Sequence, residues 1–335
     1  MTSGSADRFS SDSATYDVVG IGNALVDVIA HGDDVFLRSE DLVKGSMVLI
    51  DTERANHLYK AVGSAIEMSG GSAANTMCGV SSFGGRAAYV GKVSHDDLGD
   101  VFGHDLRAVG VTFAPGEPDG ETPTGRCIIV VTPDGQRTMS TYLGVSSFLC
   151  PSDIDLDIVA SGKVLYMEGY LFDRDVAKEA FRSAARAAHV AGRMVSLTLS
   201  DSFCVDRHRA DFRDLVRHSC DLVFGNEDEL VALYEVDTFE EAVAALRADG
   251  TMGAITRGKD GSVIVTADEV IMISVEPIEQ LVDTTGAGDL YAAGFLYGFA
   301  NGHDLAECGR LGSIAAAEVI SHVGARPLVD LHKLV

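Results

Sequence analysis

The sequence is poor in basic residues and contains no long apolar segment. Its 26 lysines and arginines stand against 50 acidic residues, which gives a formal net charge of -24, and the bases form no continuous run. Such a surplus of negative charge repels nucleic acid and anionic membrane surfaces. No apolar segment reaches the roughly 20 residues that cross a bilayer. We therefore expect neither a nucleic acid nor a membrane as a partner.

The cysteines lack the spacing of a disulfide framework or a zinc site. The six cysteines form no CxxC pair and follow no regular interval. They are typical of reduced thiols, mostly buried, in a cytoplasmic protein. The first 15 residues, MTSGSADRFSSDSAT, lack the apolar centre of a signal peptide. We expect them to form a disordered tail ahead of one large domain that spans residues 16–335.

Two common nucleotide-binding motifs are also absent. The sequence contains no GxxxxGK[ST], which excludes a P-loop. GIGNALVD, residues 20–27, has the first two glycines of the dinucleotide fingerprint GxGxxG, but Leu25 stands at the third. This departure disfavours a dehydrogenase of the Rossmann type, which would bind NAD.

Strand-like and helix-like segments alternate along most of the chain. A helical repeat of apolar residues runs through 175–192. The alternation predicts an α/β fold with a doubly wound, mostly parallel sheet and helices on both faces. The segments predicted as its central strands are 16–25, 164–168, 194–200, 221–225 and 252–256.

Residues 111–143 interrupt this alternation with strand-like segments joined by turns and no helices between them. They predict a β-meander. Together with the strand-like segment 45–50, they indicate a small sheet, contributed by about 28–50 and 111–145, that acts as a lid over a site. The alternative is an antiparallel extension of the main sheet. The open edge of such a lid leaves a monomer and a lid-mediated homodimer both open.

The segment DTTGAGD, residues 283–289, leads directly into an apolar helix. Gly286, Ala287 and Gly288 leave the backbone accessible to a ligand, and the N–H groups at a helix start attract an anion. Asp289 would then lie beside a bound phosphate. The alternative is that Asp289 only stabilises the helix amino terminus.

Two segments near the amino terminus have the residue types that bind hydroxyl groups. Asn23 and Asp27 follow the first strand, where open α/β sheets bind ligands, although both residue types also form turns. GGSAAN, residues 70–75, opens a helix with bare backbone at Gly71, and Asn75 has both donor and acceptor atoms for a substrate hydroxyl. Ser72 is expected to cap this helix and to lie beside the substrate.

Two later segments suit a nucleotide and its metal ion. NEDEL, residues 226–230, places Asn226 and Glu229 either in a helix-capping box or against the water shell of a magnesium ion. TRGKDGS, residues 256–262, offers Thr256, Gly258 and Gly261 as a flexible backbone for a nucleotide, or as a plain hairpin turn.

These segments, in this order, resemble the PfkB, or ribokinase-like, family of carbohydrate and nucleoside kinases over about residues 16–330. The resemblance implies ATP and Mg²⁺ as cofactors and an anion hole at the DTTGAGD glycines. It implies that Asp289 is the base for the acceptor hydroxyl. By the same resemblance, Asp27, Gly71 and Asn75 hold the sugar hydroxyls, and Asn226, Glu229, Thr256 and Gly258 lie along ATP and magnesium. Asn23 and Ser72 are further candidates for the acceptor, and Gly261 for ATP, because of their places in the same segments.

Three stretches are similar to the adenosine kinase-like branch of that family: GNALVDV at 22–28, SLTLSDSFC at 196–204 and GQRTMSTYLGVS at 135–146. They imply that Arg137 closes over the phosphates and that the acceptor is adenosine or a related nucleoside. DTT in place of DTN and SDSF in place of SAPF leave a free sugar (ribose, fructose or a sugar acid) as the alternative acceptor.

Three further hypotheses remain open at the level of sequence. Tyr170, near a strand end, would stack on a purine or pack in the core. Some relatives imply a monovalent cation near Asp283 and Thr285. A nucleotide-binding regulator without turnover is the non-enzymatic alternative, although binding alone does not need an acid at position 289.

Overall fold

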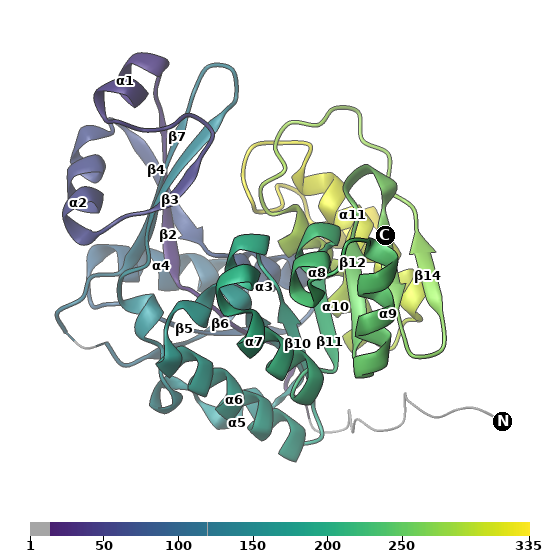
Figure 1. The fold of residues 1–335 in the computed structure, drawn as a ribbon. Helices are drawn as coiled ribbons and strands as arrows, with labels where there is room; N and C mark the ends of the chain where they lie inside the picture. Colours follow the sequence, from purple (N-terminus) through teal and green to yellow (C-terminus); the bar gives the residue numbers. More distant parts are fainter. Residues whose placement is uncertain (1–13, 119) are drawn as a thin grey trace.

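The computed structural model describes residues 14–118 and 120–335, which form two sheets with their helices (Figure 1). Of the tail predicted to be disordered, residues 1–13 lie outside the described part of the chain. Thr15 is described, and its N–H donates to Ser161 O at 2.8 Å.

The larger sheet has nine strands in the order β14-β13-β12-β11-β10-β9-β1-β5-β6. Neighbouring strands from β12 to β6 run parallel, whereas β13 pairs antiparallel with both β12 and β14. The mostly parallel sheet is therefore confirmed. Its strands are β1 (Tyr16–Ile21), β5 (Ala87–Lys92), β6 (Thr112–Gly116), β9 (Gly162–Glu168), β10 (Met194–Thr198), β11 (Leu222–Asn226), β12 (Met252–Thr256), β13 (Ser262–Val265) and β14 (Val270–Ile273).

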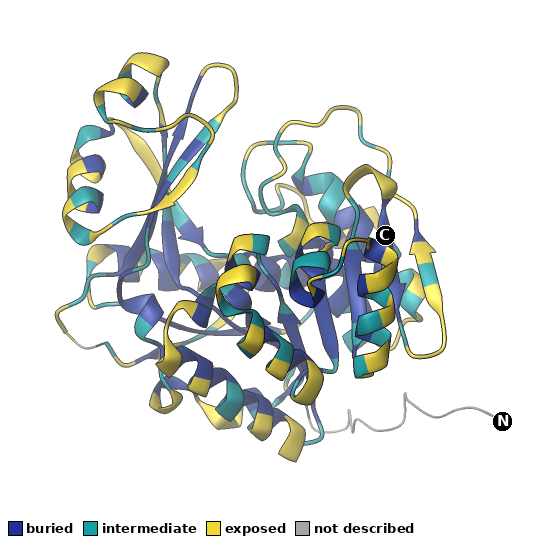
Figure 2. Ribbon diagram, viewed as in Figure 1, coloured by how far each residue is buried: buried dark blue, intermediate teal, exposed yellow. Residues whose placement is uncertain are grey.

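Helices cover both faces of this sheet because its strands are apolar on both sides. In β1, Val18 packs into one core cluster and Val19 into the other. Figure 2 shows the strands buried between the two helix layers. One layer contains α3 (Ser72–Ser82), α4 (Asp97–Ala108), α10 (Ala287–Ala300) and α11 (Leu305–Val319); the other contains α5 (Leu156–Ala160), α6 (Asp175–Val190), α7 (Ser202–His218), α8 (Glu227–Tyr234) and α9 (Phe239–Asp249).

The smaller sheet, built from strands between residues 25 and 142, projects from the main domain at the upper left of the view (Figure 1). It has the order β3-β8-β7-β2-β4. One face packs against two short helices, α1 (Asp34–Ser39) and α2 (Thr52–Ala61). Its strands are β2 (Leu25–His31), β3 (Met47–Leu49), β4 (Ala65–Gly70), β7 (Gly125–Val131) and β8 (Arg137–Tyr142).

The predicted meander over 111–143 is only partly correct. β7 and β8 do pair antiparallel, but β6 lies in the main sheet, parallel to β5. The helix α4 between β5 and β6 supplies a crossover, so this part is a βαβ unit. The turn residues that follow β6 led to the prediction of a hairpin. The helix α4 before β6 instead carries the chain across the sheet, so that β6 pairs parallel with β5.

The sequence reading also missed a strand of the small sheet and merged two others. β4 pairs with β2 over residues 65–70, ahead of the glycine-rich helix start. The segment read as one strand, 16–25, ends at Ile21, and β2 begins at Leu25 in the other sheet. Residues 22–24 therefore join the two sheets.

The order of the main sheet reverses next to β1. The chain continues from β1 to β5 and β6 on one side, and later from β9 to β12 on the other. Open parallel sheets bind ligands at the carboxyl ends of the strands beside such a reversal. This rule predicts a ligand site where β1 and β9 end. Along the described residues, none of the helices is long and apolar enough to cross a membrane.

Candidate active site

A buried carboxylate joins the ends of β1 and β9 at the point where the strand order reverses. Glu168, the last residue of β9, is 1% exposed. Its Oε1 accepts from Asn23 Nδ2 at 3.0 Å and its Oε2 accepts from Ala73 N at 2.8 Å. Burial raises the pKa of Glu168 to about 7, although these donors oppose the shift. Asn23 is thus held in place at the link between the two sheets.

The start of α3 is shaped by Gly71. Its φ is 95°, and a Cβ there would lie 2.3 Å from Asn23 O, so only glycine fits without a backbone shift. The expected cap by Ser72 is wrong, because Gly71 is the N-cap and makes no side-chain cap bond. Ser72 instead donates from Oγ to Asp289 Oδ1 at 2.6 Å. The side chain therefore points across to α10.

Asp289, in the first turn of α10, is held by two donors from α3. Besides Ser72, Asn75 donates from Nδ2 to Asp289 Oδ2 at 3.0 Å. Burial raises the pKa of Asp289 above its ordinary value, and the two hydrogen bonds oppose that shift. The carboxylate is therefore desolvated and held in one orientation, as an acceptor of a proton must be.

The start of α10 and the loop before it contain two glycines in different surroundings. Gly286 has φ 80°, and a Cβ there would lie 2.8 Å from the Cα of Ala325. The Ala287 N–H donates to Thr284 O at 3.2 Å, within the turn. A Cβ at Gly288 would meet no heavy atom within 4 Å, so there is room beside the helix start. Backbone N–H groups and the helix dipole favour an anion in that space.

Asp27 reaches this region from β2 of the small sheet. A Cβ on Gly70 of the adjacent strand would lie 2.4 Å from the Cγ of Asp27, so the carboxylate occupies the place of a side chain there. Burial raises the pKa of Asp27 to about 6; the charge of Asp289 adds to the rise, and Arg326 and Arg137 oppose it. Asp27 and Asp289 are therefore electrostatically coupled across the two sheets.

An ion pair connects the small sheet to the DTTGAGD loop. Arg137 Nη1 on β8 lies 3.1 Å from Asp283 Oδ2, and both side chains are almost fully buried. Asp283 also accepts from Thr285 N at 3.0 Å, Thr285 Oγ1 at 2.7 Å and Gly324 N at 3.0 Å. Donors and a guanidinium therefore surround this carboxylate, and the monovalent cation expected near Asp283 and Thr285 stays a prediction.

The residues expected at ATP and magnesium lie together at the carboxyl ends of β11 and β12. Asn226 is opposite Thr256 in the sheet register. Asn226 Nδ2 donates to Glu229 Oε1 at 2.7 Å, and the two form a reciprocal capping box at the start of α8. Burial raises the pKa of Glu229 to about 7. The capping interpretation therefore holds, and contact of Glu229 with the water shell of a magnesium ion stays a prediction.

The glycines after β12 differ in what they require. Gly261 has φ 86°, and a Cβ there would lie 2.0 Å from Ile273 O, so this glycine is needed by the fold. Gly258 has φ 55° with open space around it. Only Gly258 therefore leaves bare backbone for a ligand.

The short 3₁₀ helices of the described chain are Gly144–Phe148, Pro151–Asp153, Gly169–Asp173, Gly258–Asp260 and Leu331–Leu334.

Tyr170 has structural contacts on the opposite side of the sheet. It packs against the cluster under α6 and α7, and its hydroxyl donates to Ser200 O at 3.2 Å. Ser200 has φ 73°, a conformation that a non-glycine residue rarely adopts. Stacking of Tyr170 on a purine stays a prediction.

Two residues of this region were missed by the sequence reading. Glu168 ends the strand VLYME, and an acid at the carboxyl end of a buried strand is a signal that could have found it. Arg326 donates from Nε to Asn75 Oδ1 at 2.7 Å. It lies far along the chain in HVGARP, and no local pattern marks it.

The sequence profile of pfkB family carbohydrate kinases matches residues 45–331. That range includes most of both sheets and the loop at 283–289. The chain therefore belongs to the pfkB family of carbohydrate kinases. Proteins of this class are phosphotransferases that act on a hydroxyl group.

Individual relatives place the chain in the adenosine kinase-like branch. The crystal structure of an adenosine kinase from Sinorhizobium meliloti is 51% identical, with a TM-score of 0.86 over 96% of this chain and 98% of the other. A probable sugar kinase from Rhizobium etli is 49% identical, with a TM-score of 0.88 over the same shares of the two chains. Adenosine kinase 1 of Arabidopsis thaliana is 27% identical over 92% of this chain and 94% of its own.

Proposed function

We propose that this kinase transfers the γ-phosphate of ATP to the primary hydroxyl of a ribose-type acceptor, with adenosine or a related nucleoside as the acceptor. The observation that carries the proposal is the position of Asp289. Its carboxylate is partly buried, is held by Ser72 and Asn75, and lies at the start of α10 beside the open space at Gly288. A base and an anion site in that arrangement suit phosphoryl transfer to an alcohol.

The reaction assigns one task to each part of the site. Asp289 accepts the proton of the acceptor hydroxyl as the oxygen attacks phosphorus. The amides of Gly286, Ala287 and Gly288 stabilise the charge that develops on the transferred phosphoryl group. Hydrogen bonds to the acceptor hydroxyls come from Asn23, Asp27, Gly71, Ser72 and Asn75.

The ATP side of the proposal rests on the ends of β11 and β12. Asn226, Thr256, Gly258 and Gly261 would border the nucleotide, although Gly261 is also required by the fold. Glu229 would contact the water shell of Mg²⁺, which neutralises phosphate charge when it is bound. The capped geometry of Glu229 fits that indirect contact.

Arg137 is proposed as the residue that closes over the phosphates. It sits on the small sheet, and its Nη2 is buried without a hydrogen-bond partner in the described part of the chain. A guanidinium fork with a free nitrogen matches the oxygens of a phosphate. We propose that the small sheet is the lid and that Arg137 contacts both Asp283 and the transferred phosphate in the closed state.

The face of the small sheet that carries Asp27 favours a nucleoside over a free sugar. Asp27 and Ile29 are opposite Cys127 and Ile129 in the register, so these side chains share one face. Cys127, Ile129 and Val131 form an apolar cluster there, with Ile29 and Met139 against it. An apolar wall beside the acceptor carboxylate suits a flat base, whereas a free sugar presents hydroxyls around its ring. A sugar acceptor remains the alternative, since the relatives include a probable sugar kinase.

The remaining assignments are part of the same proposal. We propose a cytoplasmic protein, because all six cysteines are free thiols and five are buried. The net charge of -24 disfavours nucleic acid as a partner. A monomer and a homodimer through the small sheet remain alternatives; β3, at the edge of that sheet, is exposed at each of its three residues.

Turnover against a panel of acceptors tests this proposal. The purified chain would be assayed for ADP formation from ATP and Mg²⁺ with nucleosides, free sugars and sugar acids, each at matched concentration. We expect the highest kcat/KM with adenosine or a close relative. Turnover with free sugars and none with nucleosides would overturn the acceptor, and no transfer to any alcohol would overturn the kinase site itself.

A further inference from the structure

We propose that Arg326 is a positioning residue for the base of this reaction, acting through Asn75. The inference rests on the proposed role of Asp289 as base. Arg326 donates from Nε to Asn75 Oδ1 at 2.7 Å and from Nη2 to Ser69 O at 2.7 Å, and its Nη1 contacts Cys78 Sγ. The guanidinium therefore has partners on β4 and on α3, one layer behind the acceptor side of the site.

The contact with Arg326 fixes the orientation of the Asn75 amide. A guanidinium only donates hydrogen bonds, so the atom of Asn75 that faces it must be the carbonyl oxygen. The NH₂ group must then face Asp289, and Asn75 Nδ2 indeed donates to Asp289 Oδ2 at 3.0 Å. Asp289 and Arg326 therefore require the same amide orientation, and without Arg326 the carbonyl oxygen of Asn75 loses its donor, so that the amide is held from one side only. Arg326 thus keeps a donor on the base.

The backbone around Arg326 supports the anion loop from the other side. Gly324 N donates to Asp283 Oδ2 at 3.0 Å, and Ala325 packs where a Cβ on Gly286 would clash. Upstream, Val282 N donates to Ile320 O at 2.9 Å. One segment, 320–326, therefore contacts both the loop that would hold the phosphate and the amide that holds the base. The relative position of base and anion site depends on this segment.

The charge of Arg326 also acts on the base, among several charged neighbours. Its positive charge lowers the pKa of Asp289 and of Asp27, against the effect of burial. Removal of that charge raises the pKa of Asp289. In a plot of kcat against pH, the fall of kcat on the acid side (the acid limb) therefore begins at a higher pH. The ionisable groups coupled electrostatically to Asp289 are Asp27 on β2, Tyr166 and Glu168 on β9, Tyr170 after β9, Glu229 on α8 and Arg326 itself.

Three variants separate this role from a merely structural one: Arg326→Gln, Arg326→Lys, and Arg310→Gln as a matched control. Arg310 lies on α11, is half-exposed and pairs with Glu307, so its loss removes the same charge away from the site. The readout is the pH dependence of kcat with ATP and the best acceptor, with melting temperature recorded for each variant.

For Arg326→Gln we expect kcat at neutral pH to fall about tenfold or more, since loss of ordered catalytic geometry costs rates of that size. We expect the acid limb to move up by about one pH unit, as when an opposite charge near a carboxyl is lost. Arg326→Lys should return the acid limb of the kcat profile toward its wild-type pH, because lysine restores the positive charge. The value of kcat should stay low, because lysine lacks the planar guanidinium that contacts Asn75 and Ser69 together. Arg310→Gln should match the wild type.

A double-mutant cycle tests whether the effect passes through Asn75. If Arg326 acts through that amide, Arg326→Gln adds little to the loss already caused by Asn75→Ala. Additive losses, or an acid limb in Arg326→Gln that coincides with wild type, would overturn the inference. Failure of the proposed function is distinguishable, because the wild-type chain itself would then show no transfer to any acceptor.

Discussion

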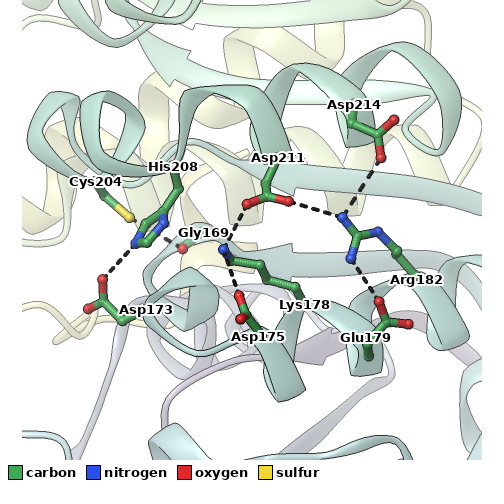
Figure 3. A network of polar contacts seen from close by, with 10 residues as sticks. All are labelled: Gly169, Asp173, Asp175, Lys178, Glu179, Arg182, Cys204, His208, Asp211 and Asp214. Carbon is green, nitrogen blue, oxygen red and sulfur yellow. Dashed lines mark hydrogen bonds and ion pairs between the residues drawn. The ribbon is translucent and has the colours of Figure 1, made fainter.

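Two charged networks of this protein use similar residues in different surroundings. One joins α3, α10 and the end of β9 around Asp289. The other lies between α6 and α7, where Lys178 and Arg182 face Asp211 and its acidic neighbours (Figure 3). Lys178 Nζ lies 2.7 Å from Asp211 Oδ2 and 3.2 Å from Asp175 Oδ1. Both networks contain well-formed hydrogen bonds, so bond geometry does not distinguish them.

The difference lies in burial. At the site, burial raises the pKa of every shifted carboxyl, namely those of Asp27, Glu168, Glu229 and Asp289. Between α6 and α7, the hydrogen bond from Lys178 lowers the pKa of Asp211. A carboxylate that is poorly solvated is the better proton acceptor, and one paired with a cation near water is the weaker. The comparison supports our proposal that the first network carries the chemistry, whereas the second is a contact between two helices.

The largest expected effect is the loss of the base. Asp289→Asn keeps the shape of the side chain but cannot take up a proton, so kcat should fall by about 100- to 10,000-fold, the usual contribution of a general base. ATP affinity should remain close to wild type, because the backbone amides are unchanged. The control is Asp214→Asn in the network between α6 and α7. Near-normal turnover in Asp289→Asn would refute the assigned base.

Arg137 gives the next largest effect. Arg137→Gln should lower kcat about 100-fold, somewhat less than arginines that contact a transferred phosphoryl group contribute elsewhere. Steady-state kinetics would be compared with Arg182→Gln, which removes an arginine from the network between α6 and α7. If both variants lose activity equally, the contrast between the two regions fails.

The pH dependence of acceptor binding sharpens the comparison further. The pKa of Asp27 is raised to about 6, so the carboxylate becomes protonated as pH falls below that value. We expect the KM for the acceptor to rise several-fold from pH 7.5 to pH 5.5, since a carboxylate that accepts hydroxyl protons loses that capacity when neutral. Asp27→Asn should remove this pH dependence while it raises KM throughout. An unchanged slope in that variant would assign the titration to another group.

The smallest effect belongs to the network between α6 and α7. Lys178→Gln should lower the free energy of unfolding by at most about 1 kcal/mol, as for other partly exposed ion pairs. Because the pKa of Asp211 is lowered in the folded state, the contribution of the pair is present above the ordinary value of 3.8 and is lost as pH falls through the lowered pKa. Chemical denaturation at pH 7 and at pH 3 measures it. A loss of kcat in this variant would contradict a purely structural role.

The sequence predicts those parts of the molecule whose signal is local. The doubly wound sheet followed from alternating segments, and the need for glycine at positions 71 and 286 and the open space at Gly288 followed from short motifs. β4 and the place of β6 did not, because strand pairing depends on partners distant in the chain. The bond between Ser72 and Asp289 spans 217 positions, and the expected helix cap competed with it.

Glu168 and Arg326 show the same limit within the site. Each works through contacts with distant segments: Glu168 with Asn23 and Ala73, and Arg326 with Asn75 and Ser69. A partly buried arginine in a carboxyl-terminal loop has no spacing or composition that marks it. Such residues become visible only when the packing of the chain is known.

The most direct test of the central claim is a crystal structure of the chain with its best acceptor and a non-hydrolysable ATP analogue. We expect the acceptor oxygen within about 2.6–3.2 Å of an Asp289 carboxylate oxygen, as a general base requires. The γ-phosphate should lie against the amides at Gly286–Gly288. An acceptor hydroxyl bound away from Asp289, with the phosphates remote from the start of α10, would contradict the account.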